Sequence, residues 1–377
     1  MNYSFWEKYF IAQDTDITII GSGIVGLSTA ISIKESAPYM SVKILERGSA
    51  PYGASTKNAG FSCFGSVSEL LHDIALMGES SCMEVVEMRW KGLKILRNRV
   101  GDEALEYKHV GGTELFRKND VILQQKCFDN LIYCNELIEK YLGLTSCYSI
   151  KTNDVLDRFE GRSIYNQYEG TINPVSMMNA LKKRCNDLNI NIFYGVEVED
   201  IDVAEKNIKT KHEVIIPYQK LIVCTNGFTK SLFPSLEVIP ARNQVLITKP
   251  LKNLSLPSAY HLDEGYVYFR QYHDRILLGG GRNLDIQGET TVDFGNTPAI
   301  QTYLSAILDE IYPGASSQID YWWSGILGIG PSKYPLIQWM DEDVLVGVRL
   351  GGMGVAIGSH LGEVLAYKVV TSFDKER

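Results

Sequence analysis

The amino-acid sequence predicts an α/β protein with a Rossmann-like domain at its N-terminus. Three observations carry this prediction. An apolar run early in the chain ends in a glycine-rich turn, a second apolar strand ends in an acidic residue, and another glycine turn precedes a helix near the C-terminus. With 377 residues the chain is long enough for two domains or one large elaborated domain.

The first predicted strand, Asp16–Ile20, is short and rich in β-branched residues. The three glycines after it have separate roles: Gly21 permits a tight strand-to-helix turn, Gly23 lets a pyrophosphate approach the backbone, and Gly26 brings helix and strand together. The N-terminus of the following helix offers free N–H groups and a partial positive charge to phosphates. The turn therefore predicts a phosphate site formed by Gly21, Ser22, Gly23, Ile24, Val25 and Gly26.

The second predicted strand, Val42–Leu45, ends at Glu46, about 20 residues after Gly26. A carboxylate at this strand end accepts hydrogen bonds from a ribose diol and repels a 2′-phosphate. Strand, glycine turn, helix, strand and acid follow one another in the order of an ADP-ribose site. The expected ligand is FAD or NAD.

Two further segments favour FAD over NAD. The stretch from Arg47 to Cys63 is small, polar and glycine-rich, and it exposes backbone N–H groups to a ligand that extends beyond its ADP end. Near the C-terminus, a strand at Val344–Val348 leads through GGMG into a helix from Val355 to about Val370. A glycine turn at a helix N-terminus suits the pyrimidine end of a flavin, which becomes anionic on reduction.

These segments resemble the D-amino-acid oxidase family of FAD-dependent amine and amino-acid oxidoreductases, which includes glycine and sarcosine oxidases. GASTKNAGF is similar to the flavin-side loop of that family, and matching segments follow in the family's order from about Asp16 to about Lys368. They are GTINPVSMMNALKKRC, NIFYGVEVEDI, KLIVCTNGFTK, IPARNQVLIT, GYVYFRQYHDRILLGGGR and VLVGVRLGGMGVAIGSHLGEVLA.

The resemblance implies a discontinuous Rossmann-like FAD-binding domain (1–75, 149–233 and 321–377) and an α+β substrate domain built on an antiparallel sheet (76–148 and 234–320). The stretch 322–337 lacks the cysteine to which sarcosine oxidases link their flavin, so FAD is expected to be noncovalent. Besides the phosphate turn, Glu46 and Arg47, the expected FAD contacts are Ala54, Ser55, Thr56, Asn58, Ala59, Gly60, Val196, Thr225, Asn226, Gly227, Gly325, Gly351, Gly352, Met353, Gly354 and Val355.

On the substrate side, the resemblance implies hydride transfer from a C–H bond next to nitrogen to the flavin, without a metal or a protein nucleophile. Several members of that family hold the substrate carboxylate with an arginine, but this chain has Leu327 and Gly328 at the corresponding place. Strand alternation in GYVYFRQ predicts a replacement clamp on one face. The predicted site residues are Tyr266, Tyr268 and Arg270, with Arg349 as a further candidate cation, whereas Lys333 is expected to be a surface charge.

Composition limits the other functions. The net charge of −8 argues against nucleic-acid or anionic-membrane partners, and seven scattered cysteines are typical of buried reduced thiols. Without a signal-like start or a membrane-length apolar run, the expected location is the cytoplasm. Three alternatives remain open: a flavin dehydrogenase of a 2-hydroxy acid or polyol phosphate, an NAD-linked dehydrogenase, and a non-catalytic flavin-binding subunit. The oligomeric state is left open.

Overall fold

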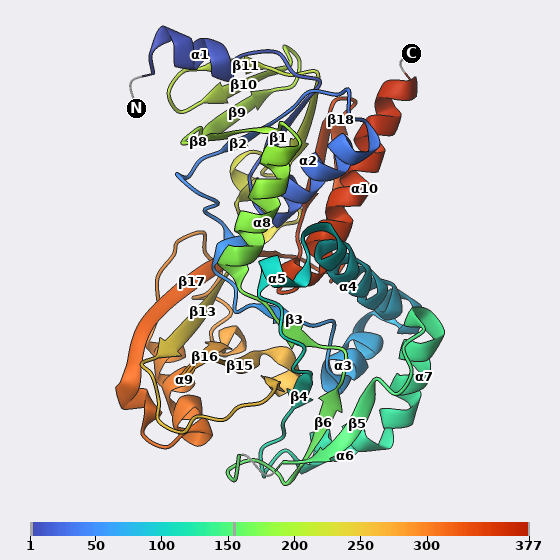
Figure 1. Ribbon diagram of the computed structural model, residues 1–377, viewed down its shortest axis with the longest axis vertical. Helices are drawn as coiled ribbons and strands as arrows, with labels where there is room; N and C mark the ends of the chain where they lie inside the picture. Colours follow the sequence, from blue (N-terminus) through green and yellow to red (C-terminus); the bar gives the residue numbers. More distant parts are fainter. Residues whose placement is uncertain (1–2, 154–155, 376–377) are drawn as a thin grey trace.

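The computed structural model describes residues 3–153 and 156–375. Two large sheets lie at opposite ends of an elongated molecule, and both chain ends lie beside the first sheet (Figure 1). This sheet has six strands in the order β18-β19-β12-β1-β2-β8. The strands are β1 (Ile17–Ile20), β2 (Val42–Glu46), β8 (Asn191–Tyr194), β12 (Lys220–Val223), β18 (Leu336–Asp341) and β19 (Val344–Val348).

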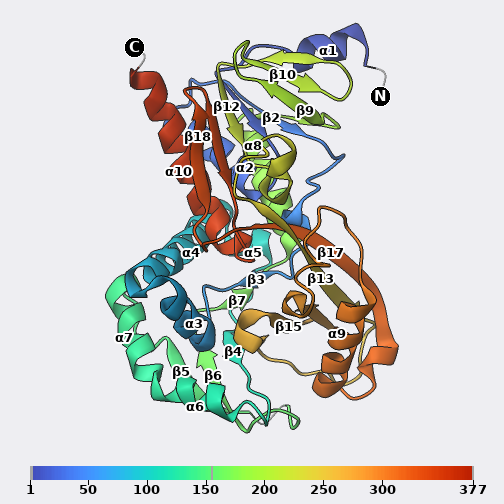
Figure 2. The same ribbon diagram turned by 180° about the vertical axis from the view of Figure 1, so that it is seen from behind.

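The five strands from β19 to β8 are parallel, and β18 adds an antiparallel edge. Helices α2 (Ile24–Ser36) and α10 (Gly354–Lys375) run side by side against the sheet (Figures 1 and 2). They approach closely because α10 presents glycines: a Cβ on Gly358 would lie 2.7 Å from the Ile24 side chain. Since parallel strands end at one edge, the predicted glycine turns after β1 and β19 meet there.

The second sheet has eight strands in the order β17-β13-β16-β15-β14-β4-β6-β5, and all its neighbours are antiparallel except β14 and β4. This matches the predicted α+β domain built on an antiparallel sheet. The strands are β4 (Gly112–Glu114), β5 (Tyr148–Thr152), β6 (Arg162–Asn166), β13 (Ile239–Thr248), β14 (Ala259–Leu262), β15 (Val267–Tyr272), β16 (Arg275–Gly280) and β17 (Ile319–Ile329).

Helices pack against this sheet in two groups (Figures 1 and 2). Helix α9 (Pro298–Ile311) buries an apolar stripe against β13–β16, while α3, α4, α6 and α7 form a separate apolar cluster with β5 and β6. The bounds of the second group are α3 (Val67–Met77), α4 (Glu79–Val100), α6 (Val121–Asp129) and α7 (Leu131–Leu142). The remaining helices are α1 (Phe5–Ile11), α5 (Asp102–Leu105) and α8 (Pro174–Asp187).

Two small sheets complete the fold. The three strands β9 (Val198–Asp202), β10 (Asn207–Thr210) and β11 (Ile215–Pro217) form an antiparallel layer near α1 (Figure 1). The pair β3 (Phe61–Ser62) and β7 (Gly170–Thr171) lies between the two large sheets (Figure 1).

The predicted domain boundaries at residues 149 and 321 do not coincide with the sheets. Strands β5 and β6, placed almost wholly in the FAD-binding part, pair with β4 in the eight-stranded sheet. Strand β17 starts at Ile319 and pairs with β13 along its length up to Ile329. Both boundaries cut through a strand because sheet membership is decided by long-range pairing that leaves no local signal in the sequence.

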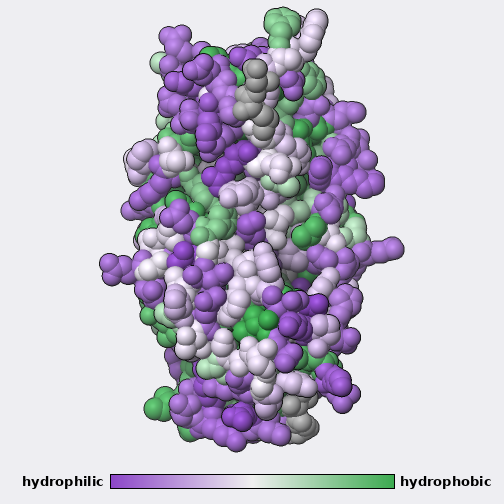
Figure 3. Space-filling model, turned by 90° about the vertical axis from the view of Figure 1, so that its left-hand side faces the viewer, coloured by the Kyte–Doolittle hydropathy of each residue, from purple (hydrophilic) through white to green (hydrophobic). Residues whose placement is uncertain are grey.

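The face in Figure 3 is mostly hydrophilic, with apolar side chains scattered over it.

Within the described ranges, no helix is long and apolar enough to cross a membrane. All seven cysteines are buried and free.

Candidate functional site

The turn after β1 is shaped by its glycines. Gly21 has a φ of +102°, and a Cβ there would lie 2.9 Å from the Cys224 carbonyl oxygen. A Cβ on Gly26 would lie 1.9 Å from the Gly21 carbonyl oxygen, so any side chain at this position would push α2 away from β1. Gly23 is the extended residue before α2, and the first helical N–H, on Ile24, donates to Ser55 Oγ over 3.0 Å. The helix N-terminus thus faces the loop that was predicted to lie beside the flavin.

Glu46 lies buried at the end of β2, opposite this turn. One carboxylate oxygen accepts hydrogen bonds from the Ser22 N–H over 3.0 Å and from Ser22 Oγ over 2.8 Å. The other accepts from the Gly48 N–H over 3.0 Å. The carboxylate is therefore held in one orientation at the edge of a cavity where a ribose diol would meet it.

This cavity, which we call the nucleotide cavity, follows the carboxyl edge of the six-stranded sheet. Arg47 lies over the rings of Phe228 and Tyr52, with its guanidinium carbon 3.8 Å and 4.8 Å from their centroids. The predicted residues that line the cavity are Gly21, Gly23, Ile24, Val25, Glu46, Arg47, Ala54, Ser55, Asn58, Val196, Thr225, Asn226, Gly351, Gly352, Gly354 and Val355.

A second cavity, the substrate cavity, continues from the first toward the eight-stranded sheet. The two share lining residues, including Ala54, Asn58, Leu327 and Gly351. The substrate cavity adds the predicted residues Ala59, Gly60, Gly325, Met353, Tyr266, Tyr268 and Arg349. A dinucleotide extended from the β1 turn to the β19 turn would run through both cavities, so the residues present fit FAD.

Five predicted residues line neither cavity. Ser22 donates to Glu46, and Gly26 packs against the Gly21 carbonyl, so both hold the turn in place without facing the cavity. Thr56 Oγ1 donates within its own loop, to the Pro51 carbonyl oxygen over 3.2 Å. A Cβ on Gly227 would lie 2.4 Å from the Leu327 carbonyl oxygen, so this glycine allows close backbone packing. The fifth is Arg270.

Arg270 is buried, and its guanidinium donates hydrogen bonds to two backbone carbonyl oxygens. Nε donates to the Ala59 carbonyl oxygen over 2.7 Å, and Nη2 donates to the Ile172 carbonyl oxygen over 3.0 Å. Burial lowers its pKa to about 10. The sequence placed Arg270 in a substrate clamp, whereas the structure makes it the anchor of the Ala59–Gly60 segment beside the cavity.

The floor of the substrate cavity is a row of residues across the eight-stranded sheet. Register places His261 opposite Tyr268, Tyr268 opposite Gly279, and Gly279 opposite Val245. The Tyr268 ring lies over Gly279, where a Cβ would come within 2.7 Å of it, and its hydroxyl accepts from Asn243 Nδ2 over 2.8 Å. Tyr266 also lines the cavity, so both predicted tyrosines reach it.

One wall carries a charge cluster in which Arg89 and Asp73 are buried and Lys333 is exposed. Arg89 Nη1 donates to Glu69 over 2.9 Å, and Lys333 Nζ lies 2.6 Å from Asp73 and 3.6 Å from Glu69. Burial opposes ionisation of Glu69, but the charges of Arg89 and Lys333 lower its pKa overall. Lys333 is exposed, as expected of a surface charge, and it pairs with Asp73 in this wall.

Among the described residues, three cations that line the cavity have no acidic partner: Lys57, whose ammonium lies over the rings of Tyr52 and Phe294, Arg349 and Arg282. Arg349 donates to the carbonyl oxygens of Tyr334 and Glu237 and to Ser332 Oγ, over 3.2 to 3.3 Å. Arg282 follows β16, and within the described ranges no residue accepts a hydrogen bond or an ion pair from its guanidinium.

Sequence reasoning missed His261, Glu69, Arg89, Asn243 and Arg282 as lining residues. Only Arg282 had a local signal, since it directly follows the three glycines that end the predicted hairpin.

Comparisons with known proteins agree with this geometry. The family model described as FAD dependent oxidoreductase matches residues 16–368. L-proline dehydrogenase from P. horikoshii is similar over 95% of this chain and 94% of its own, with a TM-score of 0.75 and 17% identity. Glycine oxidase from Geobacillus kaustophilus is similar over 95% of both chains, with a TM-score of 0.71 and 17% identity. L-alpha-glycerophosphate oxidase from Mycoplasma pneumoniae, solved with FAD bound, is similar over 96% of this chain and 95% of its own, with a TM-score of 0.70 and 13% identity. No curated protein sequence matches the chain.

Proposed function

Because the chain belongs to the family of FAD-dependent oxidoreductases, we propose that it oxidises the C–N bond of a small amine or amino acid. FAD, when bound, supplies the hydride-accepting chemistry. The chain's residues bind the substrate, orient its C–H bond toward the cofactor and exclude water.

The observation that carries this proposal is the charge of the substrate cavity, where Arg282 and Arg349 have no carboxylate partner. A guanidinium binds a carboxylate through two parallel hydrogen bonds. Arg349 is held by three acceptors, whereas Arg282 keeps its donors for a ligand. Arg282 therefore replaces Arg270 as our candidate for the carboxylate clamp, which favours an amino acid over a plain amine.

The tyrosines position the rest of the substrate. The Tyr268 hydroxyl accepts from Asn243, so its own proton remains available to a substrate oxygen or nitrogen. Burial raises the pKa of Tyr268 above its usual range and keeps the phenol protonated at neutral pH. The phenol thus acts as a neutral donor beside the clamp.

A second candidate function is oxidation of a polyol phosphate or 2-hydroxy acid, because a similar fold serves a glycerophosphate oxidase and free guanidinium groups also bind phosphate. In this reading the same two tyrosines contact a substrate hydroxyl.

Anaerobic reduction of the FAD-loaded protein separates the two. The panel contains an amino acid, the amine lacking its carboxylate, the 2-hydroxy acid with the same carbon skeleton, and a glycerol phosphate. We expect amino acids to bleach the flavin absorbance fastest. Bleaching by the hydroxy acid or the glycerol phosphate alone would favour the second function.

A further inference from the structure

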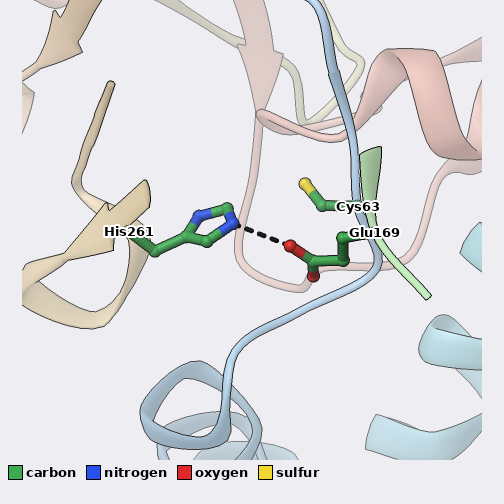
Figure 4. A group of neighbouring side chains, drawn as sticks. All are labelled: Cys63, Glu169 and His261. Atoms are coloured by element: carbon green, nitrogen blue, oxygen red, sulfur yellow. Dashed lines mark hydrogen bonds and ion pairs between the residues drawn. The ribbon is translucent and has the colours of Figure 1, made fainter. Parts of the chain in front are cut away.

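Three side chains of different chemistry meet beside the substrate cavity: Cys63, Glu169 and His261 (Figure 4). Their Sγ, carboxylate oxygen and imidazole nitrogen all lie within 4.8 Å of one another. All three are buried, with exposures of 8% for Cys63, 1% for Glu169 and 8% for His261. Cys63 and His261 line the cavity, so the group has one side open to a ligand.

The fold places these residues together through two sheets. In the antiparallel pair β3–β7, Phe61 lies opposite Thr171 and Ser62 opposite Gly170, so Cys63 and Glu169 are the next facing positions. Residues that face each other across such strands have Cβ atoms about 4.5–5.5 Å apart. His261 comes from the central strand β14 of the eight-stranded sheet. Its place is fixed by pairing with β15 and β4.

Further contacts orient the carboxylate. Asn166 Nδ2 donates to one oxygen of Glu169 over 3.2 Å, and the other oxygen lies 2.8 Å from His261 Nε2. Gly112 leaves room for it, because a Cβ there would lie 1.9 Å from that second oxygen. In protein metal sites, the side chains that bind the metal are oriented by hydrogen bonds from neighbouring residues.

We propose that Cys63, Glu169 and His261 bind a divalent transition metal, with zinc as the best match, and leave a fourth position open to the substrate cavity. One thiolate, one imidazole and one carboxylate form a ligand set that zinc accepts in tetrahedral geometry, and three protein ligands with an open position are typical of zinc sites that meet a substrate.

The geometry needs only small changes. Zinc at about 2.0–2.3 Å from each ligand requires ligand atoms roughly 3.3–3.7 Å apart. The contact between Glu169 and His261 would open by about half an ångström, and Cys63 would move in. The charges also match, because zinc with a thiolate, a carboxylate and a neutral imidazole is neutral overall. The buried site therefore holds no net charge when the metal is bound.

Metal analysis of the FAD-loaded protein tests the proposal. After incubation with zinc and gel filtration, we expect one zinc ion per chain, lost in Cys63→Ser and in His261→Gln. Cys185→Ser is the matched control, because Cys185 is also a buried free cysteine but lies in the core beside the six-stranded sheet. It should keep the metal, and FAD content reports folding of every variant.

X-ray absorption at the zinc edge of the wild-type protein decides the result even where a variant fails to fold. One sulfur at about 2.3 Å and lighter ligands at about 2.0–2.2 Å would support the site. Zinc without a sulfur ligand, or a wild-type content no higher than that of Cys63→Ser, would overturn it. Metal content does not depend on turnover, so this outcome stands apart from the proposed oxidation.

Discussion

At the residue scale, the Glu46 carboxylate is already oriented by Ser22 and Gly48 toward the nucleotide cavity. We expect Glu46→Ala to weaken FAD binding, since each charge-assisted hydrogen bond to the ribose contributes about 1.5–3 kcal/mol, or roughly ten- to hundredfold in affinity. Fluorescence titration of the FAD-free protein measures this. Glu46→Gln is the control, because it keeps an acceptor oxygen without the charge and should lose less. Unchanged affinity in Glu46→Ala would contradict the assignment of Glu46 to the ribose.

We expect replacement of Arg270 to lower FAD content and stability, and replacement of Arg282 to raise KM for the substrate. Arg270→Ala removes two hydrogen bonds to the Ala59 and Ile172 carbonyls, so we expect reduced FAD content and a lower free energy of unfolding. Arg282→Ala should leave FAD content full and raise KM for an amino acid about ten- to hundredfold, with little effect on the matching amine. Steady-state kinetics on both substrates distinguishes these outcomes. A selective rise of KM in Arg270→Ala alone would restore the clamp that the sequence predicted.

These two arginines show which features of the substrate site can be predicted from the sequence alone and which cannot. Period-two alternation predicts that Tyr266 and Tyr268 share a face, and both line the substrate cavity. It could not reveal that Arg270 finds its acceptors at residues 59 and 172, because these are distant in sequence and meet only in the folded chain. Arg282 looked like any charge after a glycine turn.

At the element scale, the buried Lys43 of β2 joins the sheet to the C-terminal end of α1 and the residues that follow it. Its ammonium donates to the carbonyl oxygens of Ile11 and Gln13, and burial lowers its pKa to about 8. The folded state thus binds this proton less tightly than the unfolded state, whose pKa is near 10.5. The cost of burying the charge is full below pH 8 and is relieved as the pH rises toward 10.5.

We therefore expect the stability of the wild-type protein, relative to Lys43→Met, to rise between about pH 8 and pH 10.5. Denaturant unfolding of both proteins across this range measures the difference, and titrations shared by the two proteins cancel. A constant difference would show that Lys43 keeps its ordinary pKa in the fold.

The elements themselves were largely predictable. The strands at Ile17–Ile20, Val42–Glu46 and Val344–Val348 and the helices after the two glycine turns agree with the sequence pattern, because burial and helix-terminal glycines are local signals. The predicted domain boundaries placed most of β5, β6 and β17 in the FAD-binding domain, although these strands pair in the eight-stranded sheet. The residues of a strand do not by themselves indicate which neighbouring strand it pairs with.

At the scale of the whole molecule, the chain passes repeatedly between the two sheets. The first sheet takes strands from both ends of the chain and from its middle, and β3 and β7 lie between the sheets. The long β13–β17 pair runs from the eight-stranded sheet back toward the glycine turn after β19, where the Gly351 N–H donates to the Gly328 carbonyl oxygen over 3.0 Å. We therefore expect that loss of structure in one sheet disturbs the other.

FAD bound through both joined cavities should therefore stabilise the molecule as one unit. At an FAD concentration a hundredfold above Kd, binding adds about 2.7 kcal/mol to the free energy of unfolding, which corresponds to a Tm increase of roughly 3–4 °C for a chain of this size. Flavin fluorescence reports release of the cofactor. Near-UV circular dichroism reports loss of packing around the tryptophans, of which Trp322 and Trp323 lie in the eight-stranded sheet and Trp339 in the first sheet. We expect the two signals to change together in one thermal transition, at a midpoint that rises with added FAD. If the tryptophan signal changed separately and its midpoint did not respond to FAD, the two sheets would unfold independently, and the cofactor would be held by the first sheet alone.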